Sequence, residues 1–146
     1  QLIPAQLDPR EFPVAAVQRA RTVGIEGRIF HDFIWGGYIL YAWPEQRVFI
    51  DGGTDFYGPA LMSTYMNVSG IQPGWRDTLS ARDIGWVLMP TTSPMVNELA
   101  HDGWLVRYCD PTAALLELDS TQMNPRDARS AIDRCADTAV VDRLVE

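Results

Sequence analysis

Two aspartates four residues apart, in a glycine-rich stretch, are the first candidates for chemistry. Asp51 and Asp55 frame the sequence Asp-Gly-Gly-Thr-Asp, and Tyr57 follows them. Because glycine lets the backbone approach a ligand closely, the two carboxylates could jointly hold a divalent cation or the hydroxyl groups of a sugar. A turn built from Asp and Gly explains the stretch equally well. The further oxygen ligands of a calcium loop are missing, so we predict no metal site.

A histidine beside an aspartate is the second candidate. His31 and Asp32 could serve as a base and its orienting acid, or as a pair of ligands. Neighbouring residues of a strand point to opposite faces, however, so the two side chains cannot readily act on one substrate. We therefore favour Asp32 as the N-cap of a helix that begins near Ile34, with ligand binding as the alternative.

Aromatic residues recur at helical spacing after this pair. Trp35, Tyr38, Tyr41 and Trp43 could form a platform on which a sugar ring stacks, although core packing is the commoner role of such a stripe. The paired glycines after Trp35 each cost a helix about 1 kcal/mol relative to alanine. Close packing of the helix on a sheet would offset that cost, and so would a ligand at the helix start.

Two short strands and a helix must position these candidates. Residues 28–33 and 47–51 are apolar runs typical of buried strands, and residues 35–43 between them suit a helix. Strands joined by a helix run parallel, so the His-Asp pair and the glycine-rich stretch should meet at the carboxyl edge of one sheet. Open α/β sheets usually bind ligands at that edge.

The rest of the chain continues the alternation of helices and strands. We expect a helix after Pro13 that stops at Gly24, helices at 59–68, 75–82 and 94–102, a central strand at 84–89, a strand at 104–109, and an antiparallel edge strand at 113–118. The predicted class is α/β, with three layers and a mixed, mainly parallel sheet of four or five strands between helices.

The domain organisation follows from the same pattern. Residues 1–11 form an extended lead-in, residues 12–119 the α/β domain, and residues 120–146 a helical extension. The polar helix expected at 126–137 either docks weakly on the sheet or protrudes.

Composition excludes several functions. The chain has 146 residues, 47% of them hydrophobic, which suits one domain with a sizeable core. Its net charge of −7 argues against a nucleic-acid partner. Because every basic residue is arginine, lysine-based chemistry such as a Schiff base is excluded. With no phosphate loop, dinucleotide fingerprint or nucleophile elbow, we predict no cofactor and no catalytic residue.

The two cysteines lack the spacing of metal ligands. We favour two free thiols, since cysteine often packs as a small apolar residue. The alternative is a bridge between Cys109 at a strand end and Cys135 in the last helix, which an oxidising compartment would permit.

Several runs also resemble a known group of proteins. They are Phe12–Pro13, Ile29–Phe33, Trp35–Tyr38 and Val48–Gly52. Over roughly residues 12–118, the chain resembles the soluble C-terminal domain of polytopic bacterial membrane proteins of the lipid-linked-sugar glycosyltransferase type. More remotely, Trp35 and Gly37–Tyr38 are similar to the Trp-Trp-Asp-Tyr-Gly signature of oligosaccharyltransferase catalytic subunits, which helps hold the acceptor; here no aspartate separates Trp35 from Tyr38.

The resemblance implies a place and a role. Such domains lie outside the cytoplasmic membrane after a block of transmembrane helices, while the catalytic carboxylates lie in membrane-side loops. No uncharged run here approaches the roughly 20 residues of a spanning helix, and the chain opens with Gln1. We therefore expect it to be a fragment whose partner is the rest of a polytopic membrane protein.

The expected function is to position an acceptor, a sugar or a neighbouring subunit, without catalysis. The candidate ligand-binding residues are Asp32, Trp35, Tyr38, Asp51, Asp55 and Tyr57. The alternative is a structural or protein-interaction module with no small-molecule site.

Overall fold

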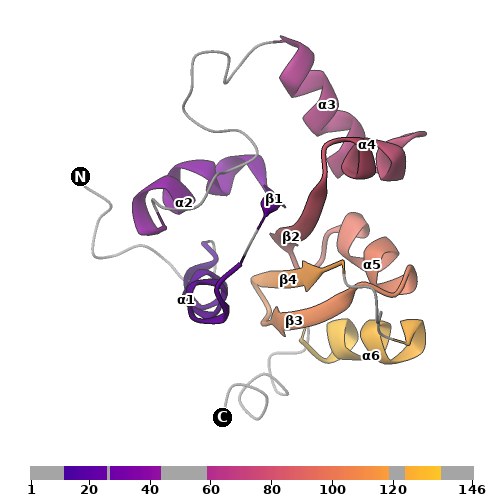
Figure 1. The fold of residues 1–146 in the computed structure, drawn as a ribbon. Helices are drawn as coiled ribbons and strands as arrows, with labels where there is room; N and C mark the ends of the chain where they lie inside the picture. The colour runs from indigo at the N-terminus through magenta and orange to yellow at the C-terminus, as the bar shows by residue number, and fades with distance from the viewer. Residues whose placement is uncertain (1–11, 26, 44–58, 119–123, 136–146) are drawn as a thin grey trace.

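A single mixed sheet organises the part of the chain that the structure describes. The computed structural model describes residues 12–25, 27–43, 59–118 and 124–135. Its strands are β1 (Arg28–His31), β2 (Ile84–Pro90), β3 (Leu105–Cys109) and β4 (Ala113–Glu117). They lie in the order β1-β2-β4-β3 (Figure 1). The α/β class with a mixed sheet is therefore confirmed.

The expectation of a mainly parallel sheet is wrong. β1 pairs parallel to β2, but β4 pairs antiparallel to both β2 and β3. The reason is the short connection between β3 and β4, which can only return the chain antiparallel. Asp110 closes this turn, since its Oδ1 accepts the N–H groups of Thr112 and Ala113 at 2.8 Å each.

β4 is also not the edge strand that the sequence predicted. It lies between β2 and β3, so β3 occupies the edge of the described sheet. The central place predicted for residues 84–89 is confirmed, because β2 has β1 on one side and β4 on the other. The strand predicted at 47–51 lies outside the described residues.

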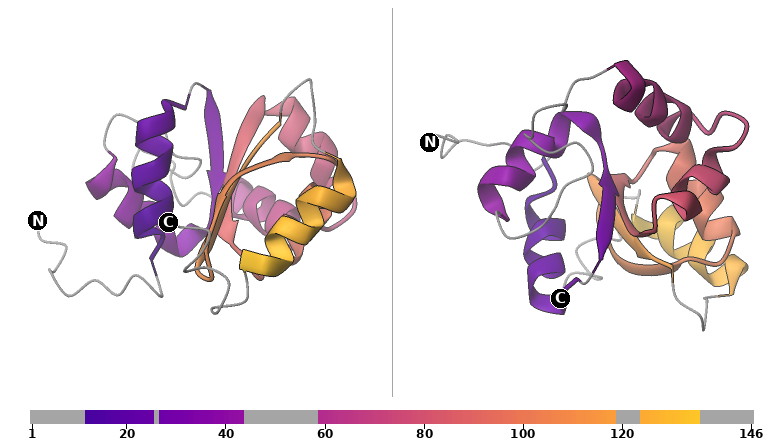
Figure 2. Two further views of the ribbon diagram at one scale, coloured as in Figure 1. Left: turned by 90° about the horizontal axis from the view of Figure 1, so that it is seen from below. Right: turned by 45° about the horizontal axis from the view of Figure 1, so that its top comes forward.

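Helices cover both faces of the sheet, which confirms three layers (Figure 2). One face carries α1 (Val14–Val23), the 3₁₀ turn η1 (Phe33–Trp35) and α2 (Gly36–Ala42). The other carries α3 (Pro59–Ser69), α4 (Trp75–Ala81), α5 (Pro94–His101) and α6 (Pro125–Cys135).

The core is split by the sheet into two clusters. Along β2, Trp86 and Leu88 pack on the side of α1 and α2, whereas Val87 and Met89 pack on the side of α4 and α5. Because successive side chains of a strand alternate between faces, a strand buried on both sides must be apolar throughout. That is the pattern that identified this strand in the sequence.

The ends of α1 and α5 follow local rules. Gly24 ends α1 with φ of 78°, a left-handed conformation that glycine adopts without strain, and its N–H donates to the Ala20 carbonyl oxygen at 3.0 Å. Ser93 caps α5, since its Oγ accepts the Met95 N–H at 3.2 Å, and Pro94 follows at the first helical position.

The last helix docks on the sheet instead of protruding. Ala128, Ile132 and Cys135 are buried on one side of α6. A disulfide joins Cys135 to Cys109 at the end of β3, with their Cα atoms 5.7 Å apart. The preference for free thiols is therefore wrong. No helix in the described ranges is long and apolar enough to cross a membrane.

Candidate functional site

An open depression of about 420 Å³ lies at the carboxyl ends of β1 and β2. Its lining comes from the residues after β1, from the end of β2 and the residues after it, from the turn between β3 and β4, and from the residue Phe12 before α1. The lining residues are Phe12, Asp32, Ile34, Trp35, Pro90, Thr92, Pro111 and Thr112. The depression therefore occupies the edge at which a parallel strand pair usually presents a ligand site.

Backbone pairing holds the walls of the depression in place. The N–H of Asp32 donates to the Leu88 carbonyl oxygen at 3.3 Å, which extends the β1–β2 ladder by one residue. The N–H of Thr91 donates to the Thr112 carbonyl oxygen at 3.3 Å, and its buried hydroxyl donates to the carbonyl oxygen of Asp110. Both contacts of Thr91 join the end of β2 to the β3–β4 turn.

Asp32 has the capping role that the sequence favours. Its Oδ1 accepts the N–H of Ile34 at 2.9 Å, at the start of η1. The side chain is only half-buried and also lines the depression. Capping and ligand binding are thus compatible at this residue, because a carboxylate has a second oxygen.

The lining combines polar and apolar groups. Asp32 contributes a carboxylate, while Thr92 and Thr112 contribute hydroxyls. Phe12 and Ile34 supply an apolar wall, and the Ile34 side chain is 74% exposed. Such a surface suits a ligand that carries several hydroxyl groups and one apolar face.

The predicted site residues are only partly brought together. Asp32 and Trp35 both line the depression, but Trp35 is 4% exposed and belongs to the core. Tyr38 is 9% exposed and packs against Phe12, with ring centroids 6.0 Å apart, so it lies behind the wall. The packing interpretation of the aromatic stripe therefore holds for Trp35, Tyr38 and Trp43. Asp51, Asp55 and Tyr57 lie outside the described residues.

Sequence reasoning missed the two threonines. Thr92 lies three residues beyond the predicted strand at 84–89, so the carboxyl-edge rule that selected Asp32 could have found it. Thr112 had no such signal, because its place depends on the return of β4 beside β2.

His31 is buried beneath this edge and held neutral. Its side chain is 0% exposed, and Nδ1 lies 2.8 Å from the carbonyl oxygen of Asp32. Burial lowers the pKa of His31, and the contact with that carbonyl and the nearby Asp32 charge offset the effect only in part. A neutral ring that donates from Nδ1 leaves Nε2 as an acceptor, and this atom has no hydrogen-bond donor in the described structure.

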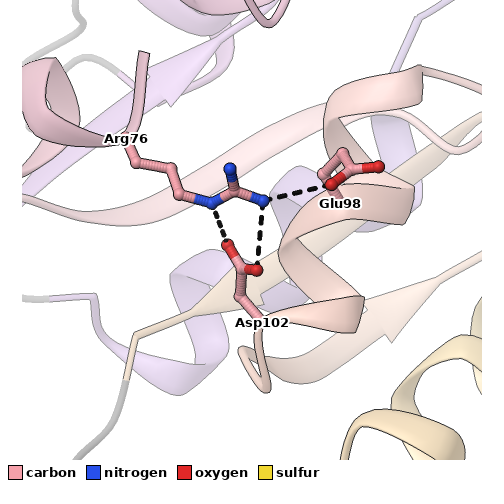
Figure 3. A network of polar contacts seen from close by, with 3 residues as sticks. All are labelled: Arg76, Glu98 and Asp102. Atoms are coloured by element: carbon pink, nitrogen blue, oxygen red, sulfur yellow. Dashed lines mark hydrogen bonds and ion pairs between the residues drawn. The ribbon is translucent and has the colours of Figure 1, made fainter. Parts of the chain in front are cut away.

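A second polar cluster links α4 to α5 (Figure 3). Arg76 Nε donates to Asp102 Oδ2 at 2.7 Å, while Nη2 donates to Asp102 Oδ1 and to Glu98 Oε1, both at 3.1 Å. These carboxylates raise the pKa of Arg76, chiefly through the hydrogen bonds to Asp102. Because the guanidinium and both carboxylates satisfy one another, we assign the cluster a structural role.

Metal binding finds no support in the described ranges, where no three His, Cys, Asp or Glu side chains are grouped as ligands. Comparisons with protein-family models, curated proteins and solved structures found no match for this chain.

Proposed function

We propose that the chain is a non-catalytic, extracytoplasmic domain of a membrane glycosyltransferase-like protein, and that it positions a sugar or a sugar-bearing acceptor. The depression at the carboxyl ends of β1 and β2 is the proposed site. The observation that carries the proposal is its lining, which combines the Asp32 carboxylate and the hydroxyl-bearing side chains of Thr92 and Thr112 with apolar residues. Sugars offer matching hydroxyl groups and apolar ring faces.

The disulfide supports an extracytoplasmic place. Disulfides persist in oxidising compartments and are rare in the cytosol. Cys109 and Cys135 are joined, and the chain has no other cysteine. The resemblance to glycosyltransferase-type proteins makes the rest of a polytopic membrane protein the natural partner.

The groups around the depression favour binding over catalysis. Its lining includes a carboxylate and hydroxyls but neither histidine nor cysteine among the described residues. His31, the nearest candidate base in sequence, is fully buried, and its Nδ1 is held by a backbone carbonyl. A general base must reach the proton that it removes, and this ring does not line the depression.

An NMR titration with a panel of monosaccharides and disaccharides tests the site. We expect saturable amide shifts at Asp32 to Trp35, at Thr92 and at Thr112. Thr92→Val removes a hydroxyl, and Asp32→Asn removes the charge but keeps an oxygen that can cap η1. Each variant should weaken sugar binding about three- to tenfold, since Thr92→Val removes one hydrogen bond and Asp32→Asn removes the charge from another.

Thr22→Val is the matched control. Thr22 is exposed on α1, donates to the Gln18 carbonyl oxygen and does not line the depression. This variant should bind like the parent chain. Titrations that leave the depression unshifted would instead favour the alternative, a structural or protein-interaction module.

A further inference from the structure

Three arginines from three elements line one hollow at the edge of the sheet. The hollow has a volume of about 190 Å³ and follows the outer side of β3 between α1 and α6. Its arginines are Arg19 from α1, Arg107 from β3 and Arg134 from α6. We call it the arginine groove. Three cations in one hollow are unusual for a chain with a net charge of −7.

A β-bulge places the middle arginine. Val106 lies opposite Leu116 and Tyr108 opposite Leu115, so Arg107 is the extra residue between two paired positions. The guanidinium of Arg107 lies 5.6 Å from the ring centroid of Trp86, and it also pairs with Glu117 on β4. Both contacts hold this cation in one orientation.

The flanking arginines are held from either side. The guanidinium of Arg19 lies 5.3 Å from the ring centroid of Tyr108, a cation–π contact. Arg134 Nη1 donates to Ser130 Oγ at 2.9 Å, and the adjacent Cys135 is fixed to Cys109 by the disulfide. Each flanking arginine thus has a contact that restrains its side chain, and such restraint lowers the entropy lost on binding.

The positive charge of the groove is only partly compensated. Glu117 pairs with Arg107, and Asp110 accepts the Tyr108 hydroxyl at 2.8 Å, but neither carboxylate lines the groove. Within the described residues, Arg19 and Arg134 have no carboxylate partner. Clustered cations with few carboxylates nearby create a positive electrostatic potential that attracts anions, and a concave surface strengthens that potential.

We propose that the arginine groove binds a phosphate-bearing ligand. Guanidinium groups present planar pairs of N–H donors that match phosphate oxygens, and arginine is preferred wherever such recognition is needed. The groove and the depression at the carboxyl ends of β1 and β2 share no lining residue. This second site goes beyond the sugar-binding role and stands without it.

The first experiment titrates the whole, oxidised chain with inorganic pyrophosphate at low salt, followed by NMR. We expect saturable shifts of the arginine Nε–H signals and of the backbone amides from Arg107 to Cys109. Arg134→Gln should weaken binding about tenfold, because it removes a charge-assisted hydrogen bond. Arg19→Gln should act in the same direction.

Arg129→Gln provides the matched control. Arg129 is exposed on the same helix and does not line the groove, so this variant changes the net charge by the same amount as Arg134→Gln. It should leave the affinity within twofold of the parent value. The proposal is overturned if pyrophosphate causes no saturable shift, or if Arg129→Gln and Arg134→Gln weaken binding equally.

Vesicle sedimentation separates two sources of the phosphate group. One set of vesicles is pure phosphatidylcholine, and the other contains phosphatidylglycerol. Retention on the anionic vesicles that Arg134→Gln abolishes and Arg129→Gln preserves would identify a lipid head group. Pyrophosphate binding without such retention would identify a soluble phosphate ester.

Discussion

The disulfide between Cys109 and Cys135 joins the last residue of β3 to the last residue of α6 across 26 positions of sequence. Asp110, which closes the turn beside the depression at the carboxyl ends of β1 and β2, follows Cys109 directly. Arg134, which lines the arginine groove, precedes Cys135. The disulfide is therefore next in sequence to a residue of the turn beside the depression and to a residue that lines the arginine groove.

Reduction of this bond should lower the stability of the domain. A cross-link between residues 26 positions apart restricts the unfolded chain. Because the reduced chain has more unfolded conformations, removal of the disulfide should lower the free energy of unfolding by about 3.5 kcal/mol. Urea unfolding of the native chain with and without reductant measures this loss, and the double variant Cys109→Ala/Cys135→Ala provides a second estimate. Equal midpoints under both conditions would contradict the prediction.

The stability of the chain should fall as the pH drops below about 6.5, because of His31. Burial lowers the pKa of His31 in the folded state, so the unfolded state binds the proton more readily. The His31 contribution is therefore complete above the unfolded pKa of about 6.5 and is lost as the pH falls towards the lower, folded pKa. One such group contributes a slope of at most about 1.4 kcal/mol per pH unit. Urea unfolding at pH 7.5, 6.5 and 5.5 measures the slope.

His31→Asn and His101→Asn test whether that slope belongs to the buried ring. Asparagine at position 31 keeps a donor for the Asp32 carbonyl but does not titrate, so the slope should flatten. His101, the other histidine of the chain, is exposed at the end of α5, and His101→Asn serves as the matched variant for comparison. A slope that persists in His31→Asn would assign the titration to other groups.

The Arg76–Asp102 pair should couple α4 to α5 only modestly. The two side chains are 50% and 26% exposed, and exposed ion pairs stabilise proteins by up to about 1 kcal/mol. A double-mutant cycle of Arg76→Ala and Asp102→Ala should give a coupling energy of about 0.5–1 kcal/mol, which shrinks in 1 M NaCl. The same cycle with Glu98→Ala should give a smaller value, because Glu98 makes one contact and Asp102 makes two. A coupling that salt leaves unchanged would show that packing, and not charge, links the helices.

Much of the local structure was predictable because it depends on local physics. The strand at 84–89 was recognisable as central, since burial on both faces requires an unbroken apolar run. Gly24 marks a helix end because glycine permits the left-handed backbone angles found there. Pro94 marks a helix start because proline restricts φ to a helical value. Neither effect depends on distant residues. Asp32 was predictable as a cap because its side chain accepts a backbone N–H only two residues away.

The sheet order and both proposed sites were decided by tertiary structure. The apolar run at residues 113–116 indicates a buried strand, but not that β4 pairs with β2 and thereby displaces β3 to the edge. That choice brings Thr112 to the same depression as Asp32. It also leaves Arg107 on the open strand between Arg19 and Arg134. Apolar patterns in the sequence indicate which segments are buried. Which strands become neighbours across a long sequence separation depends on the packing of the whole sheet, and no local pattern indicates it.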